Sequence, residues 1–82
     1  MTAEQILEKL TEIFREVFDD EAIALSRETT AADIDGWDSF NNINIMVAAE
    51  MAFGVKFLTA EVEQFKNVGD LIDSIGVKLE GK

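Results

Sequence analysis

A stretch without proline or glycine runs from Ser39 to Phe53 and is bounded by Asp38 on one side and Gly54 on the other. Asp and Ser are preferred at helix N-caps, because their side-chain oxygens accept hydrogen bonds from the free N–H groups of the first turn. Gly54 can adopt the left-handed conformation that ends a helix and turns the chain away. The stretch therefore predicts a helix over residues 39–53.

The first part of the chain shows a second helical pattern. Thr2 is followed three residues later by Gln5, which is the spacing of a capping box. Apolar residues then recur at intervals of three and four, namely Ile6, Leu10, Ile13, Phe14 and Val17. This pattern predicts a helix from about Ala3 to Phe18, with its acidic residues on a solvated outer face.

The last third of the chain predicts two more helices. Thr59 can cap a short helix that extends through Phe65, and Asn67 can cap a longer one. The inner residues of the longer helix are spaced by three and four, and they are Val68, Leu71, Ile72, Ile75 and Leu79. Residues 1-82 are thus expected to form one all-α domain, a small four-helix bundle with three longer helices and one short helix.

The segment from Asp19 to Asp38 has no sustained period and predicts a long first loop. Its apolar residues Ile23, Leu25, Ile34 and Trp37 can fix the loop to the bundle. Trp37 has two interpretations: a partly buried anchor that holds the loop against the 39–53 helix, which we favour, and a contact residue for a partner.

The 39–53 helix carries apolar residues on two lines. Phe40, Ile43, Val47 and Glu50 fall on one, and Met46, Ala49 and Phe53 fall on the other. We expect most of these residues in the core. Met51 is expected on the side away from Ile43 and Val47, where an exposed thioether suits contact with a partner.

Charge and composition exclude several classes of function. The chain has no His or Cys, so a self-contained nucleophilic or zinc enzyme is not expected. A net charge of −10 argues against binding to nucleic acid or to an anionic membrane, and favours basic partner surfaces. No stretch is long and apolar enough to span a bilayer, and Met1-Thr2-Ala3-Glu4 does not begin a secretory signal. The expectation is a cytoplasmic, soluble monomer.

The hydroxyl of Ser39 lies at the N-terminus of the predicted 39–53 helix. A helix start has unpaired N–H groups and a partial positive charge, so a phosphodiester on Ser39 would be stabilised there. Asp33, Asp35 and Asp38 could suggest calcium, but an EF-hand loop beginning at Asp33 lacks the required Gly and Glu. We predict no metal site.

Three segments in this order carry a family resemblance: Gly36-Trp37-Asp38-Ser39, then Phe53-Gly54-Val55-Lys56-Phe57, then Asn67-Val68-Gly69-Asp70-Leu71. Together they resemble the acyl carrier protein family over nearly the whole chain. The resemblance implies that a phosphopantetheinyl transferase, using Mg²⁺, attaches the 4′-phosphopantetheine of coenzyme A to Ser39. Asp38 would help the transferase to hold the metal, and acyl groups would travel as thioesters on the terminal thiol. The long first loop also matches this family.

The 39–53 helix departs from the pattern of fatty-acid carriers, which place several carboxylates there and Leu after the serine. This chain has neutral or apolar residues instead, with Glu50 as the one charge, and we expect partners to contact Trp37, Phe40, Asn41, Asn44, Glu50 and Met51. The departure suggests a dedicated carrier in lipid or secondary-metabolite synthesis. Two alternatives stay open, an aminoacyl, D-alanyl or peptidyl carrier and an unmodified acidic helical adaptor.

Overall fold

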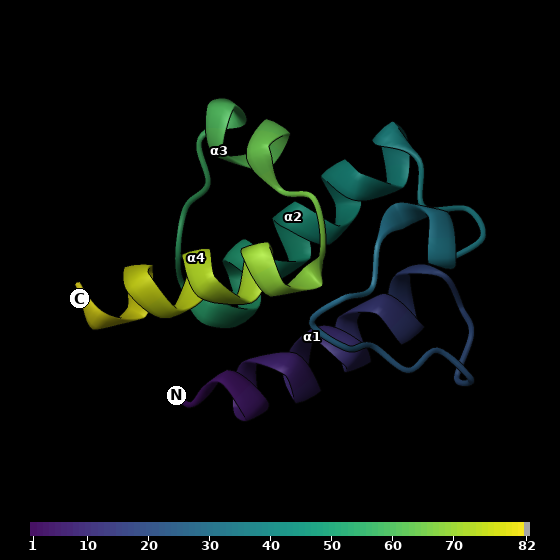
Figure 1. Cartoon of the computed structure of the whole chain (residues 1–82), viewed down its shortest axis with the longest axis horizontal. Helices are drawn as coiled ribbons and strands as arrows, with labels where there is room; N and C mark the ends of the chain where they lie inside the picture. The colour runs from purple at the N-terminus through teal and green to yellow at the C-terminus, as the bar shows by residue number, and fades with distance from the viewer. Residues whose placement is uncertain (82) are drawn as a thin grey trace.

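A computed structural model describes residues 1–81 of the chain, and these residues form a bundle of helices without strands. The elements are α1 (Ala3–Val17), the short 3₁₀ helix η1 (Ala31–Asp33), α2 (Ser39–Phe53), α3 (Thr59–Gln64) and α4 (Val68–Glu80). Figure 1 shows α1 below α2 and α4, the short α3 above them, and both chain ends on the same side. The expected all-α fold with three longer helices and one short helix is confirmed.

The helix starts show which caps the sequence predicts well. The Thr2 hydroxyl accepts from the N–H of Gln5 at 3.2 Å, and the Gln5 side chain accepts from the N–H of Thr2 at 2.8 Å, so the capping box is present. Asn67 caps α4 by accepting from the N–H of Asp70 at 2.9 Å. The end of α1 is one residue earlier than expected, because Phe18 is its C-cap.

The start of α3 differs from the prediction. Its N-cap is Leu58 rather than Thr59, and the helix ends at Gln64, with Phe65 as the C-cap. The N–H of Leu58 is satisfied from inside the helix, by the Glu61 carboxylate at 2.9 Å. A carboxylate three residues into a helix can thus bind a free N–H without any polar side chain at the cap.

A single apolar core lies between the three longer helices. α1 packs against both α2 and α4, and the largest fully buried side chains come from all three. They are Phe14, Ile6, Leu10, Ile45, Leu71, Ile72, Ile75 and Val68. The predicted inner faces of α1 and α4 are therefore correct, with Val17 and Leu79 only partly buried.

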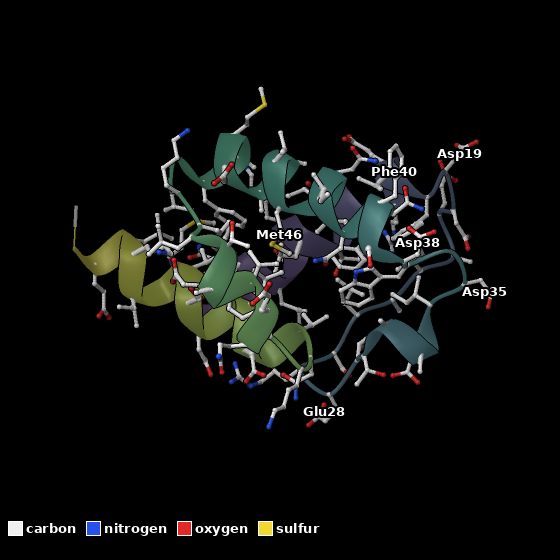
Figure 2. All side chains as sticks on the ribbon, turned by 90° about the horizontal axis from the view of Figure 1, so that it is seen from above. Asp19, Glu28, Asp35, Asp38, Phe40 and Met46 are labelled. Atoms are coloured by element: carbon white, nitrogen blue, oxygen red, sulfur yellow. The ribbon has the colours of Figure 1, made fainter. Side chains whose placement is uncertain are left out.

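The predicted inner face of α2 is only half right. Ile45, Met46, Ala49 and Phe53 are buried, but Phe40, Ile43 and Val47 are 73%, 63% and 49% exposed. Figure 2 shows Met46 among the helices and Phe40 at the periphery. The cause is that α2 is apolar on both sides, so that neighbouring helices, rather than the pattern, decide which side is covered.

Met51 is 82% exposed, as expected, but for a different reason. It follows Val47 by four residues and so lies on the same face as Val47 and Ile43, not opposite them. All three reach solvent because that whole face is uncovered.

The first loop is fixed to the bundle at several points. Ile23, Leu25, Ile34 and Trp37 are partly buried against the core, as predicted. The N–H groups of Val68 and Gly69 at the start of α4 donate to the carbonyls of Thr29 and Arg27 at 2.9 and 2.8 Å. A side chain at position 69 would place its Cβ 2.9 Å from the Arg27 carbonyl oxygen, so this approach requires glycine. A pair between Arg27 and Asp73, with both carboxylate oxygens at 2.9–3.0 Å, closes the same contact.

Candidate functional site

Ser39 is the first residue of α2, and its side chain is exposed. The N-cap is Asp38, which has an extended backbone and accepts from the N–H of Asn41 through Oδ1 at 2.9 Å. Capping is therefore done by the carboxylate, and the adjacent hydroxyl is not needed for it. The result is a free hydroxyl at the positive end of a helix macrodipole.

The turn before Ser39 is fixed from both sides. Gly36 has φ of 86°, a left-handed conformation that favours glycine. The Asn41 amide Nδ2 reaches back and donates to the Gly36 carbonyl at 2.6 Å. These contacts set the direction in which the chain enters α2, and with it the position of Ser39.

Trp37 is the anchor of this turn. Its ring meets the ring of Phe14 edge-on at 4.9 Å between centroids, and its Nε1–H donates to Oδ1 of Asn42 at 2.9 Å. It thus ties the loop to α1 and α2 at once. The structure supports the anchor interpretation of Trp37; its contact with a partner stays a prediction.

A pocket of about 330 Å³ opens beside Ser39. Its lining includes Ser39, Asn42 and Met46 from α2, Val62 from α3, Phe65 from the segment between α3 and α4, and Leu71 from α4. The pocket thus leads from the exposed hydroxyl into the space between α2, α3 and α4. A flexible apolar group attached near Ser39 could leave water there.

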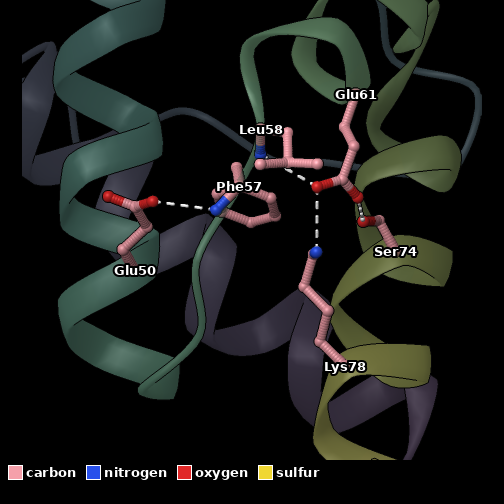
Figure 3. A network of polar contacts seen from close by, with 6 residues as sticks. All are labelled: Glu50, Phe57, Leu58, Glu61, Ser74 and Lys78. Carbon is pink, nitrogen blue, oxygen red and sulfur yellow. Dashed lines mark hydrogen bonds and ion pairs between the residues drawn. The ribbon is translucent and has the colours of Figure 1, made fainter.

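Two predicted contact residues have internal partners that the sequence did not reveal. Oε2 of Glu50 accepts from the backbone N–H of Phe57 at 2.9 Å, which ties α2 to the segment before α3 (Figure 3). Asn41 binds Gly36, as described above, and Asn44 lies 3.5 Å from its side-chain oxygen. The bond between Asn41 and Gly36 joins residues five positions apart, and the bond between Glu50 and Phe57 joins residues seven positions apart. A pattern with helical spacing of three or four cannot predict such contacts. Phe40, Asn44 and Met51 are exposed.

The acidic residues near Ser39 do not form a metal site in residues 1–81, where no three potential ligands gather. Asp33 is instead occupied locally, since its Oδ2 accepts from the backbone N–H of Thr30 at 2.9 Å. Asp19, Asp35 and Asp38 are exposed and lie at the same end of the molecule as Phe40 (Figure 2). They give this end a negative surface.

The chain is similar to known proteins in sequence and in structure. No family model matches the chain. A curated relative, an acyl carrier protein of Acidothermus cellulolyticus, is 36% identical over 75 residues, which are 92% of this chain and 89% of the relative.

Two solved structures match almost the whole fold. The solution structure of a holo acyl carrier protein from Geobacter metallireducens is 49% identical, with a TM-score of 0.87 over 93% of this chain and 87% of that one. The crystal structure of an acyl carrier protein from Thermotoga maritima is 26% identical, with a TM-score of 0.84 over 96% of this chain and 92% of that one.

Proposed function

The chain belongs to the acyl carrier protein family, and we propose that it carries acyl groups as thioesters on a 4′-phosphopantetheine arm attached to Ser39. Proteins of this family are carriers and not enzymes, so the chemistry is performed by partners. The observation that carries the proposal is the exposed Ser39 hydroxyl at the start of α2, next to a carboxylate that already caps the helix.

The residues around Ser39 fit a phosphodiester. The first turn of α2 offers N–H groups and the positive end of the helix dipole, which favour a phosphate at this position. Oδ1 of Asp38 is engaged by the N–H of Asn41, which leaves Oδ2 to help a phosphopantetheinyl transferase hold Mg²⁺. No residue of this chain is His or Cys, so the transferase supplies the base that takes the Ser39 proton. When bound, the arm supplies a terminal thiol that forms the thioester.

The pocket beside Ser39 favours an acyl cargo over an aminoacyl cargo. Its lining includes the apolar side chains of Met46, Phe65 and Leu71, beside polar residues such as Asp38, Asn42 and Lys66. An alkyl chain gains by leaving water against this apolar part of the lining, whereas an ammonium group would lose hydration against it. Aminoacyl, D-alanyl and peptidyl carriers remain the alternative, because Gly36-Trp37-Asp38-Ser39 also resembles their motif.

We further propose a dedicated pathway for lipid or secondary-metabolite synthesis, in the cytoplasm and with the protein as a monomer. Between Ser39 and Phe53 only Glu50 is charged, and it is engaged by Phe57. General charge-steered recognition by basic enzyme surfaces is weak in this case. No helix within residues 1–81 could cross a bilayer.

The experiment is modification in vitro, read by intact mass. Incubation with coenzyme A, Mg²⁺ and a broad-specificity phosphopantetheinyl transferase should add one phosphopantetheine group, and Ser39→Ala should abolish the gain. Ser74→Ala is the matched control and should still gain it. An unmodified wild-type chain, or a Ser39→Ala variant that is still modified, contradicts the proposal. The mass of the protein from its own cells then identifies the cargo.

A further inference from the structure

The pocket beside Ser39 contains an amide whose orientation is fixed by a neighbour. Oδ1 of Asn42 accepts from Nε1–H of Trp37 at 2.9 Å, and within residues 1–81 this is the only hydrogen bond of the Asn42 side chain. An indole N–H can only donate, so the oxygen of the Asn42 amide, and not its nitrogen, must face the indole. The group that Asn42 has left for a further partner is therefore Nδ2, which can only donate.

Asn42 lies between the attachment residue and the apolar part of the pocket. Ser39, Asn42 and Met46 all line the pocket, and they follow one another along α2 at intervals of three and four residues, which places them on one face. Ser39 is exposed, Asn42 is half-buried and Met46 is buried, and Figure 2 shows Met46 among the helices. A group that enters from Ser39 thus passes a hydrogen-bond donor before it reaches apolar side chains.

We propose that Asn42 determines specificity for the cargo, and that the preferred cargo is an acyl group with an oxygen on C3, the second carbon beyond the thioester carbonyl, followed by an alkyl tail. The inference rests on the proposed function and names the class of its substrate. The oxygen on C3 accepts a hydrogen bond from Nδ2 of Asn42, and the tail lies against Met46 and Leu71. The end of the cargo next to the thioester enters last and so stays nearest to Asn42.

The donor discriminates against the other cargoes. A saturated chain beside Nδ2 of Asn42 displaces water from the amide and returns no hydrogen bond, which costs free energy. An ammonium group also only donates, so an aminoacyl cargo cannot pair its amine with Nδ2. A site that bonds an oxygen rejects the analogue without that oxygen more strongly than an apolar pocket rejects one missing methylene.

The test compares two cargoes that differ only at C3. A broad-specificity phosphopantetheinyl transferase loads the protein from hexanoyl-coenzyme A or from 3-oxohexanoyl-coenzyme A, and intact mass confirms the loading. Circular dichroism then gives the Tm of each loaded form. A ketone buried without a partner would make the 3-oxohexanoyl form the less stable of the two. We expect the opposite order in wild type, with a Tm about 4–8 °C higher for the 3-oxohexanoyl form, as one hydrogen bond of ordinary net strength gives in a domain of this size.

Asn42→Asp removes the donor and keeps the shape of the side chain. One carboxylate oxygen can still accept from Nε1–H of Trp37, whereas the other replaces Nδ2 and cannot donate. The higher Tm of the 3-oxohexanoyl form should be lost or reversed in this variant. Gln64→Glu is the matched control, because it also exchanges an amide for a carboxylate, at an exposed site at the end of α3. This control should keep the wild-type difference in Tm between the two loaded forms.

The outcomes separate this inference from the proposed function. Failure of wild type to accept either cargo contradicts the function itself. Normal loading with a 3-oxohexanoyl form no more stable than the hexanoyl form, or with the same difference in Asn42→Asp as in wild type, overturns the role of Asn42 and leaves the function intact. The rival acceptor is an amide oxygen of the arm. A rise in Tm on attachment of the arm alone that is lost in Asn42→Asp would assign Nδ2 to the arm and overturn the proposal.

Discussion

Helices α1 and α2 are both fifteen residues long and pack against each other, yet their outer faces are opposite in character. The outer face of α1 carries Glu4, Glu8, Glu12 and Glu16, all exposed, and its apolar residues are inside. The outer face of α2 instead carries four exposed apolar residues, Phe40, Ile43, Val47 and Met51. In α1 a large apolar residue indicates the core, whereas in α2 a large apolar residue lies either in the core or exposed to solvent.

The exposed apolar face of α2 favours self-association, and the acidic residues elsewhere in the chain oppose it. An exposed line of apolar side chains invites self-association. The acidic face of α1 and the acidic loop contribute most of the net charge of −10, which opposes the approach of further copies. The acidic surface of α1 thus opposes the self-association that the exposed apolar face of α2 would otherwise favour.

The largest effect is expected from removing the central side chain of α1. Phe14 is fully buried and contacts the rings of Phe18 and Trp37. We expect Phe14→Ala to reduce the free energy of unfolding by about 3–5 kcal/mol, measured by urea denaturation. Glu16→Ala on the outer face of α1 is the control and should stay within about 0.5 kcal/mol of wild type. A small effect of Phe14→Ala would show that α1 does not supply the centre of the core.

Two isoleucines test the same contrast inside α2. Ile45 is fully buried and Ile43 is 63% exposed, although they are the same residue type in the same helix. We expect Ile45→Ala to reduce the free energy of unfolding by about 2–5 kcal/mol, and Ile43→Ala by less than about 0.5 kcal/mol. Equal losses in urea denaturation would mean that the two faces of α2 do not differ, and the comparison with α1 would fail.

The starts of α1, α2 and α4 and the end of α2 could be predicted because each is set by residues close in sequence. Thr2 with Gln5, Asp38 with Gly54, and Asn67 are local signals, and the structure uses them all. The buried face of α2 could not be predicted, since it depends on which side α1 covers and both sides offer large apolar residues.

The position of Asp38 and Ser39 at a helix start could be predicted, because a helix start is a local feature. The contacts that hold the segments around this helix start in place could not be predicted. Glu50 binds the N–H of Phe57, Asn41 binds the carbonyl of Gly36, and the pocket joins α2 to residues of α3 and α4. Each depends on how separate segments meet, and polar pairs of this kind leave no period in the sequence.

A moderate effect is expected from making α2 resemble α1 in charge. We predict that the modified wild-type protein is a poor substrate for general fatty-acid elongation enzymes, and that Asn44→Glu with Met51→Glu raises kcat/KM severalfold by steering toward basic surfaces. Asn41 is left unchanged because a carboxylate there would face the Gly36 carbonyl. The gain should shrink as NaCl is raised. Wild-type activity equal to that of a carrier with an acidic α2 would contradict the proposal of a dedicated pathway.

The acidic residues of α1 and α3 also differ in their surroundings. The glutamates on the outer face of α1 are exposed to solvent, whereas Glu61 of α3 is bound by several neighbouring groups. Glu61 accepts from the N–H of Leu58 and from Nζ of Lys78, both at 2.9 Å, and lies 3.4 Å from the hydroxyl of Ser74 (Figure 3). The backbone bond from Leu58, followed by the bond from Lys78, holds the pKa of Glu61 below its ordinary value of 4.5.

The smallest effect on the free energy of unfolding is therefore expected from Glu61, and its size depends on pH. Because the pKa of Glu61 is lower in the folded state, the charged carboxylate stabilises the fold fully above its ordinary pKa, and this contribution is lost as the pH falls through the lowered folded value. Glu61→Gln should thus be less stable than wild type in urea at neutral pH, and the gap should close in acid. Glu8→Gln, an exposed change on α1, controls for the loss of one negative charge. A gap that does not depend on pH, or an equal gap for Glu8→Gln, would show that the network does not hold the Glu61 carboxylate in its charged form.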